Sequence, residues 1–215
     1  MKTIVVIGGS KGIGKAIVKT FLDTHKVINI SRSSPGETHP NLTHLGCDIL
    51  KDELPDVTIV DALVYCPGSI NLKPFARLSL EDFREDFEIN LIGAVKAVQK
   101  YLDPLKMGDS PSILLFSTVA SKLGMPYHAS IATAKSGVEG LVKSLGAELS
   151  PTIRINAIAP TVTDTQLASK LLRNEKMIEN IKERHPLKKF LNPKEVAEMA
   201  QFLLSEKAAS ISGQI

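Results

Sequence analysis

Short apolar runs alternate with helical patterns along the whole chain. Each run is rich in β-branched residues, is bounded by Gly, Pro, Ser or Asp, and is mostly apolar at consecutive positions. Strands that are buried on both faces of a parallel sheet have this pattern. The predicted strands are Thr3–Ile7, Val27–Ile30, Ile59–Tyr65, Ser112–Phe116 and Ile153–Ile158, with a weaker candidate at Leu42–Leu45.

Between these runs, apolar residues recur at the spacing of amphipathic helices. The predicted helices are Ile13–Leu22, Ser79–Leu102, Ser130–Leu149, Pro193–Leu204 and a charged helix within Asp164–Glu183. Ser79 followed by Asp82 resembles a capping box at the start of the second helix. The stretch between Asp48 and Ile59 is short and contains Pro55, so we expect an irregular or one-turn connection there. Alternating strands and helices predict an α/β fold, a Rossmann-type doubly wound parallel sheet in which residues 1–215 form a single domain.

Composition and charge narrow the classes of function. Hydrophobic residues make up 43% and charged residues 23% of the 215 residues, as in an ordinary globular protein. The net charge of +3 is small, and Lys and Arg are interleaved with Asp and Glu, which favours neither nucleic acid nor a membrane as a partner. Cys47 and Cys66 form no disulfide framework, and neither they nor His39 and His44 have metal-ligand spacing. No apolar run resembles a signal peptide or a membrane span. We therefore expect a cytoplasmic protein without a metal site.

The first predicted strand runs directly into Gly8-Gly9-Ser10-Lys11-Gly12-Ile13-Gly14 and then into a helix. Gly8 permits a sharp turn, while Gly12 and Gly14 let backbone amides and the helix N-terminus approach a pyrophosphate. A glycine-rich turn alone also fits a tight strand–helix loop. The strand, the glycine spacing and the helix together favour a dinucleotide site.

The end of the second predicted strand favours NADP(H) as the cofactor. NAD-preferring sites place an Asp or Glu there to bind the ribose 2′-hydroxyl. This chain has Ser31-Arg32-Ser33 instead, with no acidic residue. Arg32 can bind a 2′-phosphate with two donors while it stacks on adenine, and Lys11 can supply a second positive charge. The alternative is that both residues are solvated surface cations.

Several segments resemble the short-chain dehydrogenase/reductase family, and together they extend along most of the chain. They are Gly8–Gly14, Cys47–Ile49, Phe87–Gly93, Ala134–Leu141, Asn156–Thr165 and Ile211–Gln214. The second resembles the family's adenine-contacting acid, the third its catalytic asparagine segment, and the fourth its active-site helix. The fifth resembles its nicotinamide-facing loop, and the last the start of its final strand.

The resemblance implies an oxidoreductase that acts on a small carbonyl or alcohol compound, with a substrate lid at residues 161–190. It implies catalytic roles for Asn90, Thr118 and Lys135. The implied cofactor contacts are Gly8, Ser10, Lys11, Gly12, Ile13, Gly14, Arg32, Asp48, Ile49, Gly68, Lys135, Pro160, Val162 and Thr165.

The chain departs from the family at the residue that transfers the proton. In the family a tyrosine lies four residues before the lysine, on the same helix face, and the lysine holds the nicotinamide ribose and lowers the tyrosine's pKa. Ile131 occupies that position here. An aliphatic side chain cannot transfer a proton, and general acid–base help is worth about 10² to 10⁴ in rate.

Two more departures concern the edges of the site and of the sheet. The family's Asn-Asn-Ala-Gly after the fourth strand reads Tyr65-Cys66-Pro67-Gly68, which keeps only the glycine. The sequence also stops at Ile215, where the family's last strand would begin, so we expect a truncated C-terminal strand.

Two hypotheses about function follow. In the first, the protein is an NADP(H)-dependent oxidoreductase whose proton comes from Tyr127, from His128, or from a water held by Asn90 and Lys135. Tyr127 and His128 could instead be packing residues of the cleft border. In the second, Ile131 marks a non-catalytic NADP(H)-binding regulatory or assembly module.

Association of two or four copies is expected from the resemblance. Ser79–Leu102 and Ser130–Leu149 resemble the helices that the family uses for its tetramer contact. Ala132, Ser136 and Gly140 are small enough for close helix approach, so we predict a homodimer or homotetramer.

Overall fold

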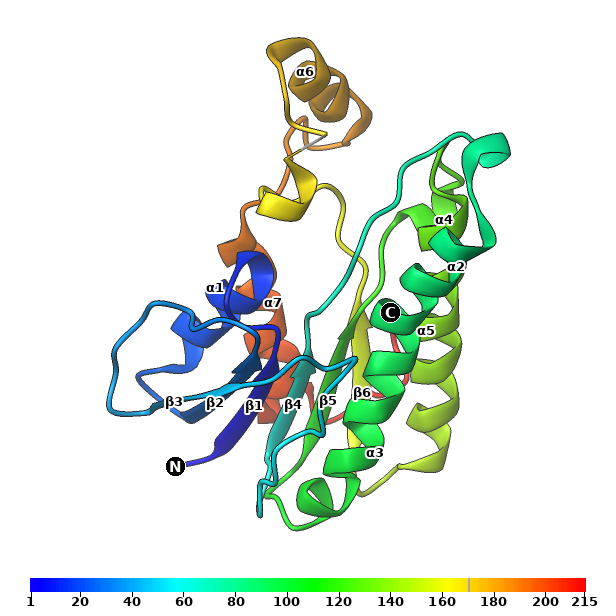
Figure 1. Ribbon diagram of the computed structural model, residues 1–215. Helices are drawn as coiled ribbons and strands as arrows, with labels where there is room; N and C mark the ends of the chain where they lie inside the picture. Colours follow the sequence, from blue (N-terminus) through cyan, green and yellow to red (C-terminus); the bar gives the residue numbers. More distant parts are fainter. Residues whose placement is uncertain (170) are drawn as a thin grey trace.

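The computed structural model describes residues 1–169 and 171–215, and in this part of the chain six parallel strands form one sheet (Figure 1). Their order is β3-β2-β1-β4-β5-β6. The strands are β1 (Thr3–Ile7), β2 (Lys26–Ser31), β3 (Leu42–Gly46), β4 (Ala62–Tyr65), β5 (Ser112–Phe116) and β6 (Arg154–Ile158). This arrangement confirms the predicted Rossmann-type doubly wound fold.

Helices cover both faces of the sheet. The α-helices of the described chain are α1 (Gly12–Phe21), α2 (Leu80–Phe87), α3 (Gly93–Lys106), α4 (Ala120–Leu123), α5 (Ala129–Glu148), α6 (Glu175–Arg184) and α7 (Pro193–Leu204). The short 3₁₀ helices are η1 (Phe75–Arg77), η3 (Gln166–Ala168) and η4 (Glu206–Ala208). A π-helical turn, η2 (Glu88–Ile92), joins α2 to α3. Figure 1 shows α1 and α7 on one face and α3 and α5 on the other, while α6 stands apart beyond the carboxyl ends of the strands.

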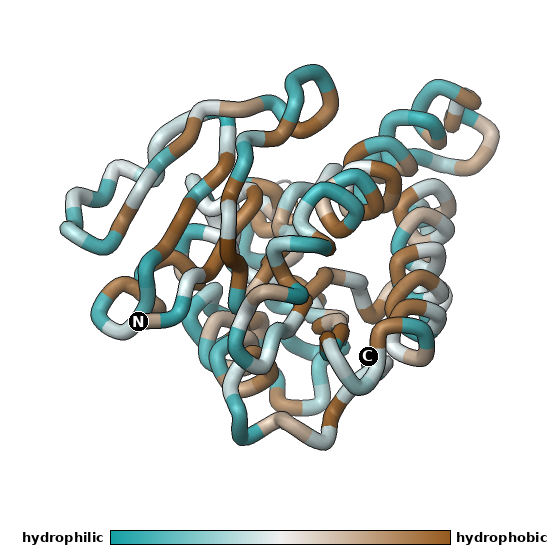
Figure 2. The backbone as a smooth tube through the Cα atoms, turned by 90° about the horizontal axis from the view of Figure 1, so that it is seen from below, coloured by the Kyte–Doolittle hydropathy of each residue, from teal (hydrophilic) through white to brown (hydrophobic). Residues whose placement is uncertain are grey.

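The alternation of side chains along β1 explains why its sequence is apolar at every position. Val5 and Ile7 are buried in the core beneath α3 and α5. Ile4 and Val6 are buried in a second core beneath α1 and α7. Figure 2 shows the result, with strand segments that are largely hydrophobic and helices that alternate between hydrophobic and hydrophilic turns.

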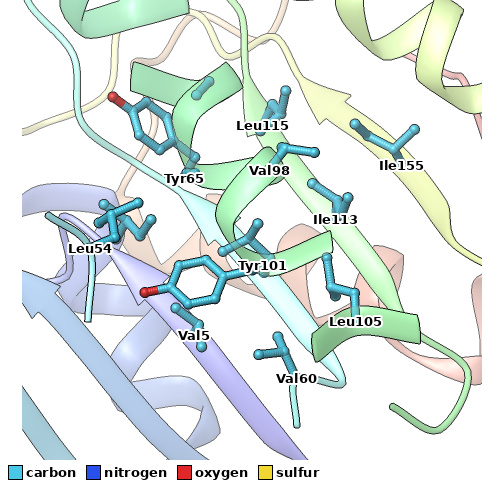
Figure 3. Close-up of a cluster of buried hydrophobic side chains, with 14 of the residues drawn as sticks. Val5, Leu54, Val60, Tyr65, Val98, Tyr101, Leu105, Ile113, Leu115 and Ile155 are labelled. Carbon is cyan, nitrogen blue, oxygen red and sulfur yellow. The ribbon is translucent and has the colours of Figure 1, made fainter. Parts of the chain in front are cut away.

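Two tyrosines anchor irregular backbone to the first of these cores (Figure 3). The Tyr101 hydroxyl donates to the Pro55 carbonyl at 2.8 Å, and its ring is fully buried. The Tyr65 hydroxyl donates to the Ile89 carbonyl at 2.6 Å. The segment between β3 and β4 therefore packs its Leu54 into the core although it contains no helix, as the sequence predicted.

The long helix predicted from Ser79 is confirmed, together with its capping box. The Asp82 amide donates to the Ser79 hydroxyl at 3.1 Å, and the Ser79 amide donates to the Asp82 carboxylate at 2.9 Å. Helical backbone then continues through α2, η2 and α3 as far as Lys106, four residues beyond the predicted end.

Several predicted boundaries differ from the structure, most of them by one residue. Strand β4 begins at Ala62 rather than Ile59, because the Val60 amide donates to the Pro104 carbonyl and not to a neighbouring strand. Strand β6 begins one residue late, at Arg154. The charged helix predicted within Asp164–Glu183 is two pieces, η3 and α6, and Lys170 between them lies outside the described residues.

The C-terminal residues lie along β6, where the sequence predicted the start of a further strand. The Gly213 amide donates to the Ile155 carbonyl at 2.7 Å, and the Ala157 amide donates to the Gln214 carbonyl at 2.9 Å. These residues have extended pairing with the sheet edge but are not part of the six-stranded sheet.

A substitution of Gly93 tests the packing of Tyr65 against the π-helical turn. A Cβ at Gly93 would overlap the Tyr65 hydroxyl, whereas one at Gly140 would meet nothing within 4 Å. We expect Gly93→Ala to lower the free energy of unfolding by about 1–3 kcal/mol. Gly140→Ala should raise it by about 0.5–1 kcal/mol, because it replaces a flexible residue within a helix. Urea denaturation of both variants checks this, and equal stability of the two would refute the packing argument.

Candidate active site

A cleft of about 650 Å³ opens at the carboxyl ends of β1, β2 and β4. It lies where the strand order reverses, since β1 pairs with β2 on one side and with β4 on the other. Open α/β sheets bind ligands at this switch point. The predicted cofactor residues that line it are Gly8, Ser10, Lys11, Gly12, Ile13, Gly14, Arg32, Asp48, Ile49, Gly68 and Thr165.

The glycine turn at the floor of this cleft requires glycine for two separate reasons. Gly8 has a φ of +79° and Gly12 a φ of +52°, a region that other residues rarely adopt. A Cβ at Gly14 would overlap the Gly8 carbonyl oxygen. Helix α1 begins at Gly12 with no side-chain cap and no acidic residue in its first turn, so its N-terminal amides are available to an anion.

Basic and acidic side chains both line the cleft. Arg32 and Lys11 are exposed and line it together with Ser31 and Ser33. Asp48 lines it after β3, and its carboxylate accepts a hydrogen bond from the Leu50 amide at 3.1 Å. The residues present thus fit a nicotinamide dinucleotide.

A second cavity of about 260 Å³ continues from the cleft, and the two share lining residues that include Gly68 and Thr165. The predicted residues that line this second cavity are Gly68, Asn90, Thr118, His128, Lys135, Pro160, Val162 and Thr165. Four of the five candidate catalytic residues are therefore brought together. Tyr127 is the exception: its side chain is 60% exposed and is not part of the lining.

Lys135 is buried at the centre of this arrangement. Its Nζ donates to the Phe116 carbonyl at 2.8 Å. Burial lowers the pKa of Lys135 to about 8, against the opposing influence of Cys66 and Asp86. Burial also raises the pKa of the neighbouring Cys66 thiol to about 12, so that thiol stays protonated at neutral pH.

Asn90 presents an unsatisfied acceptor next to this lysine. The π-helical turn η2 positions Asn90, and π-helical turns are frequent at functional sites. Its Nδ2 donates to the Ser69 hydroxyl at 3.0 Å and to the Asp86 carbonyl at 2.8 Å. Its Oδ1 is buried without a partner, and a Cβ at Gly68 would lie 3.1 Å from that atom. A buried acceptor without a donor is costly, so a ligand or water donor is expected there.

Asp86 and Ser69 extend the polar network and were missed in the sequence. The Ser69 hydroxyl donates to Asp86 Oδ1 at 2.5 Å, and Asn71 Nδ2 donates to the same oxygen at 3.3 Å. Asp86 is fully buried, and its Oδ2 has no partner. One signal was available, since an aspartate four residues before Asn90 shares its helix face and is directed toward the core.

Thr118 lies beside a buried carboxylate that holds its loop. The Ser117 hydroxyl donates to Glu139 Oε1 at 2.7 Å, the Ser121 hydroxyl donates to the same oxygen, and Lys122 pairs with Oε2 at 2.8 Å. Burial alone would raise the pKa of Glu139, but Lys122 and the two serines hold it below its usual value. Glu139 thereby fixes the segment that presents the Thr118 hydroxyl to the cavity.

Comparisons with known proteins agree with this geometry. A family model described as enoyl-(acyl carrier protein) reductase matches residues 49–215. The chain belongs to the short-chain dehydrogenase/reductase family. Members of this family are oxidoreductases of carbonyl and alcohol substrates that bind NAD(H) or NADP(H).

Individual members resemble the chain over nearly its whole length. A 2,5-dichloro-2,5-cyclohexadiene-1,4-diol dehydrogenase of Sphingobium indicum is 28% identical, with 99% of this chain and 93% of the relative covered. A carbonyl reductase [NADPH] of Sus scrofa is 29% identical, with 97% and 91% covered. The structure of ligand-free aldohexose dehydrogenase from Thermoplasma acidophilum superimposes with a TM-score of 0.90 at 29% identity, covering 99% of this chain and 90% of that one.

Ile131, which the sequence predicts at the family's tyrosine position, lines the second cavity. It is 4% exposed and lies one helical turn before Lys135, and both residues line the cavity. His128 lies at the N-terminal end of the same helix, and its Nδ1 is 2.7 Å from the Pro126 carbonyl oxygen. An imidazole thus lies on the wall of the cavity that Ile131 and Lys135 line.

The expected lid segment, residues 161–190, contributes to the cavity from two places. Val162 and Thr165 line it from the loop after β6, and Ile181 and Arg184 line it from α6. Arg184 is exposed to solvent and also lines the cavity. Lys170 of this segment lies outside the described residues.

Neither a metal site nor a membrane-spanning helix is found in residues 1–169 and 171–215. No three His, Cys, Asp or Glu side chains there gather as metal ligands would. None of the helices in that part of the chain combines the length and hydropathy that a bilayer requires.

The pH dependence of stability tests the buried carboxylate. Because the folded-state pKa of Glu139 is depressed, its contribution is complete above the unfolded pKa of about 4.3 and is lost as pH falls through the folded value. We expect Glu139→Gln to lower the free energy of unfolding at pH 7 by about 1.5–3 kcal/mol, by weakening hydrogen bonds to a charged group. Urea denaturation at several pH values should show that the stability difference between the wild type and Glu139→Gln becomes smaller below about pH 4.3.

The exposed Glu148 of the same helix provides the matched control. Glu148→Gln should change stability by less than about 0.5 kcal/mol at either pH. A Glu139→Gln effect that stays the same at every pH at which the protein is folded, from pH 7 to well below about pH 4.3, contradicts the assignment.

Proposed function

We propose that this protein is an NADP(H)-dependent oxidoreductase that reduces a small carbonyl compound or oxidises the matching alcohol. The continuity of the glycine-lined cleft with a second cavity that holds Lys135, Asn90 and Thr118 carries this proposal. A cofactor in the cleft would extend its reactive end to the side chains that handle the substrate.

The preference for NADP(H) rests on charge at the wall of the cleft. Arg32 offers a planar fork of donors to a 2′-phosphate, and Lys11 adds a second cation. The residues beside Arg32 are serines, so no carboxylate is positioned to bind a ribose 2′-hydroxyl in the NAD manner. The Sus scrofa relative is itself named as an NADPH enzyme.

Residues of the chain would bind the cofactor, orient the substrate and supply the proton. The bound cofactor supplies or accepts a hydride. Lys135 holds the nicotinamide ribose, and the Thr118 hydroxyl orients the substrate carbonyl. With a pKa of about 8, Lys135 also holds a proton near neutral pH; a water bound at Asn90 Oδ1 would give its own proton to the substrate oxygen and be reprotonated by Lys135.

His128 is the second candidate for the proton donor. Its position in the cavity wall favours it over Tyr127, whose hydroxyl lies on an exposed side chain outside the lining. An imidazole is a competent general acid near neutral pH.

Ile131 supports the alternative of a non-catalytic NADP(H)-binding regulatory or assembly module. Its buried alkyl side chain fills the place in the cavity from which the family's tyrosine acts. In that case the cofactor would bind and no turnover would follow.

Two further expectations belong to this proposal. We expect a homodimer or homotetramer formed through α2, α3 and α5, because the exposed Ile92 lies on this surface. We also expect a cytoplasmic location, in keeping with the free thiols of Cys47 and Cys66.

Turnover assays separate the oxidoreductase from the module. We expect NADPH oxidation with a panel of small aldehydes and ketones, faster than NADH oxidation, and falling as pH rises through about 8 because Lys135 loses its proton. Lys135→Ala should abolish NADPH oxidation. Lys143 is an exposed lysine on the same helix, and Lys143→Ala should leave the rate of NADPH oxidation unchanged.

Two more variants identify the proton donor. His128→Gln should reduce turnover about 10²-fold if the imidazole is the donor and leave it unchanged if Lys135 is. Ile131→Tyr should raise turnover by about 10²-fold or more, because it restores the family's acid. NADPH binding without turnover in the wild-type protein would refute the oxidoreductase and support the module.

A further inference from the structure

The second cavity is apolar over most of its wall and contains one cation whose place the cofactor does not explain. The apolar lining includes Ile70, Phe116, Val119, Met125, Ile131, Leu171 and Ile181. The charged side chains of the lining are Lys135 and Arg184, and no Asp or Glu lines it within the described part of the chain. Arg184 is exposed to solvent but also lines the cavity, so a substrate in the cavity can reach it.

Arg184 is directed to the cavity by the geometry of α6. Ile181 and Arg184 are three residues apart, so they share a face of this helix, and both line the cavity. The other charged residues of the helix, such as Lys176 and Glu183, lie outside the lining. The inward face of α6 therefore presents an apolar side chain and then a guanidinium.

This cation is separate from the cations of the cofactor cleft. Arg32 and Lys11 line the cleft and not the second cavity, whereas Arg184 lines the second cavity and not the cleft. Lys135 donates a hydrogen bond to the Phe116 carbonyl and lies near the place where the cofactor cleft and the second cavity meet. Arg184 thus faces the part of the site that the substrate occupies, beyond the reach of the 2′-phosphate position.

We propose that the substrate is a small, largely apolar carbonyl compound that carries a carboxylate, and that Arg184 binds this carboxylate. The proposal rests on the proposed function for the carbonyl, and on the cavity for the rest. A guanidinium matches the two oxygens of a carboxylate with two parallel donors, while the apolar walls would hold the rest of the substrate. The volume of about 260 Å³ limits the substrate to a small molecule.

A matched pair of aldehydes tests the charge alone. 4-Formylbenzoate and 4-formylbenzamide have the same ring and the same aldehyde, and differ in a carboxylate against a neutral amide. Their dissociation constants are measured by calorimetry with the protein saturated with NADP⁺, which cannot reduce the aldehyde. We expect the wild-type protein to bind the benzoate about three- to tenfold more tightly, as for a partly exposed ion pair with charge-assisted hydrogen bonds.

Variants of α6 and of the segment before it assign the preference to one residue. Arg184→Gln should remove the preference, and Arg184→Lys should keep most of it because the charge remains. Arg173→Gln makes the same change at an exposed arginine outside the cavity lining, so it should leave the preference unchanged. Raising the salt concentration to about 0.5 M should narrow the preference in the wild type by screening.

The outcomes separate this proposal from the proposed function. Equal affinities in the wild type, no binding of either compound, or a preference that survives Arg184→Gln overturns the carboxylate subsite. Reduction of 4-formylbenzamide by NADPH with no charge preference leaves the oxidoreductase standing without the subsite. A preference that Arg184→Gln removes, with no turnover of either compound, leaves the subsite standing without the oxidoreductase.

Discussion

The reversal of the chain between β1 and α1 is the constraint on which the rest of the site depends. Strand β1 is the buried centre of the sheet, so the backbone must turn at once when it emerges from the carboxyl edge. It does so through left-handed backbone at Gly8 and Gly12, and it passes so close to itself that Gly14 has no room for a side chain. The uncapped N-terminus of α1 then points at the point where the strand order reverses, which creates an anion site before any side chain is added.

The carboxyl edge of the sheet also explains why a second cavity, with different chemistry, lies next to the cofactor cleft. Strand β4 delivers Gly68 between the two cavities, and the π-helical turn brings Asn90 against that glycine. Lys135 reaches the junction from α5 and is anchored on the end of β5 by the Phe116 carbonyl. Buried polar groups with unused acceptors, such as Asn90 Oδ1, therefore lie where a ligand can satisfy them, and the buried Ile131 contributes an apolar part of the wall.

Much of the fold and of the glycine turn could be predicted from the sequence, because these features depend on residues that are close together in the chain. The consecutive apolar residues of β1, the glycine spacing and the capping box at Ser79 are all short-range signals, and the structure confirms the elements that they predict. The start of β4 could not be predicted, since Val60 pairs with Pro104, which is distant in the sequence. The cavity-lining position of Arg184 was likewise hidden, because a charged face looks the same in the sequence whether solvent or a cavity lies beside it. Asp86 was missed for a related reason, as its partners Ser69 and Asn71 belong to another loop.

Calorimetric titration with NADPH and NADH is the most direct test of the account. The wild-type protein should bind NADPH at one site with a dissociation constant in the micromolar range, and bind NADH about tenfold or more weakly, because Arg32 and Lys11 hold the additional phosphate. Arg32→Ala should bring the two affinities close together. The absence of saturable binding of either dinucleotide at millimolar concentration would contradict the claim that the glycine turn forms a cofactor site.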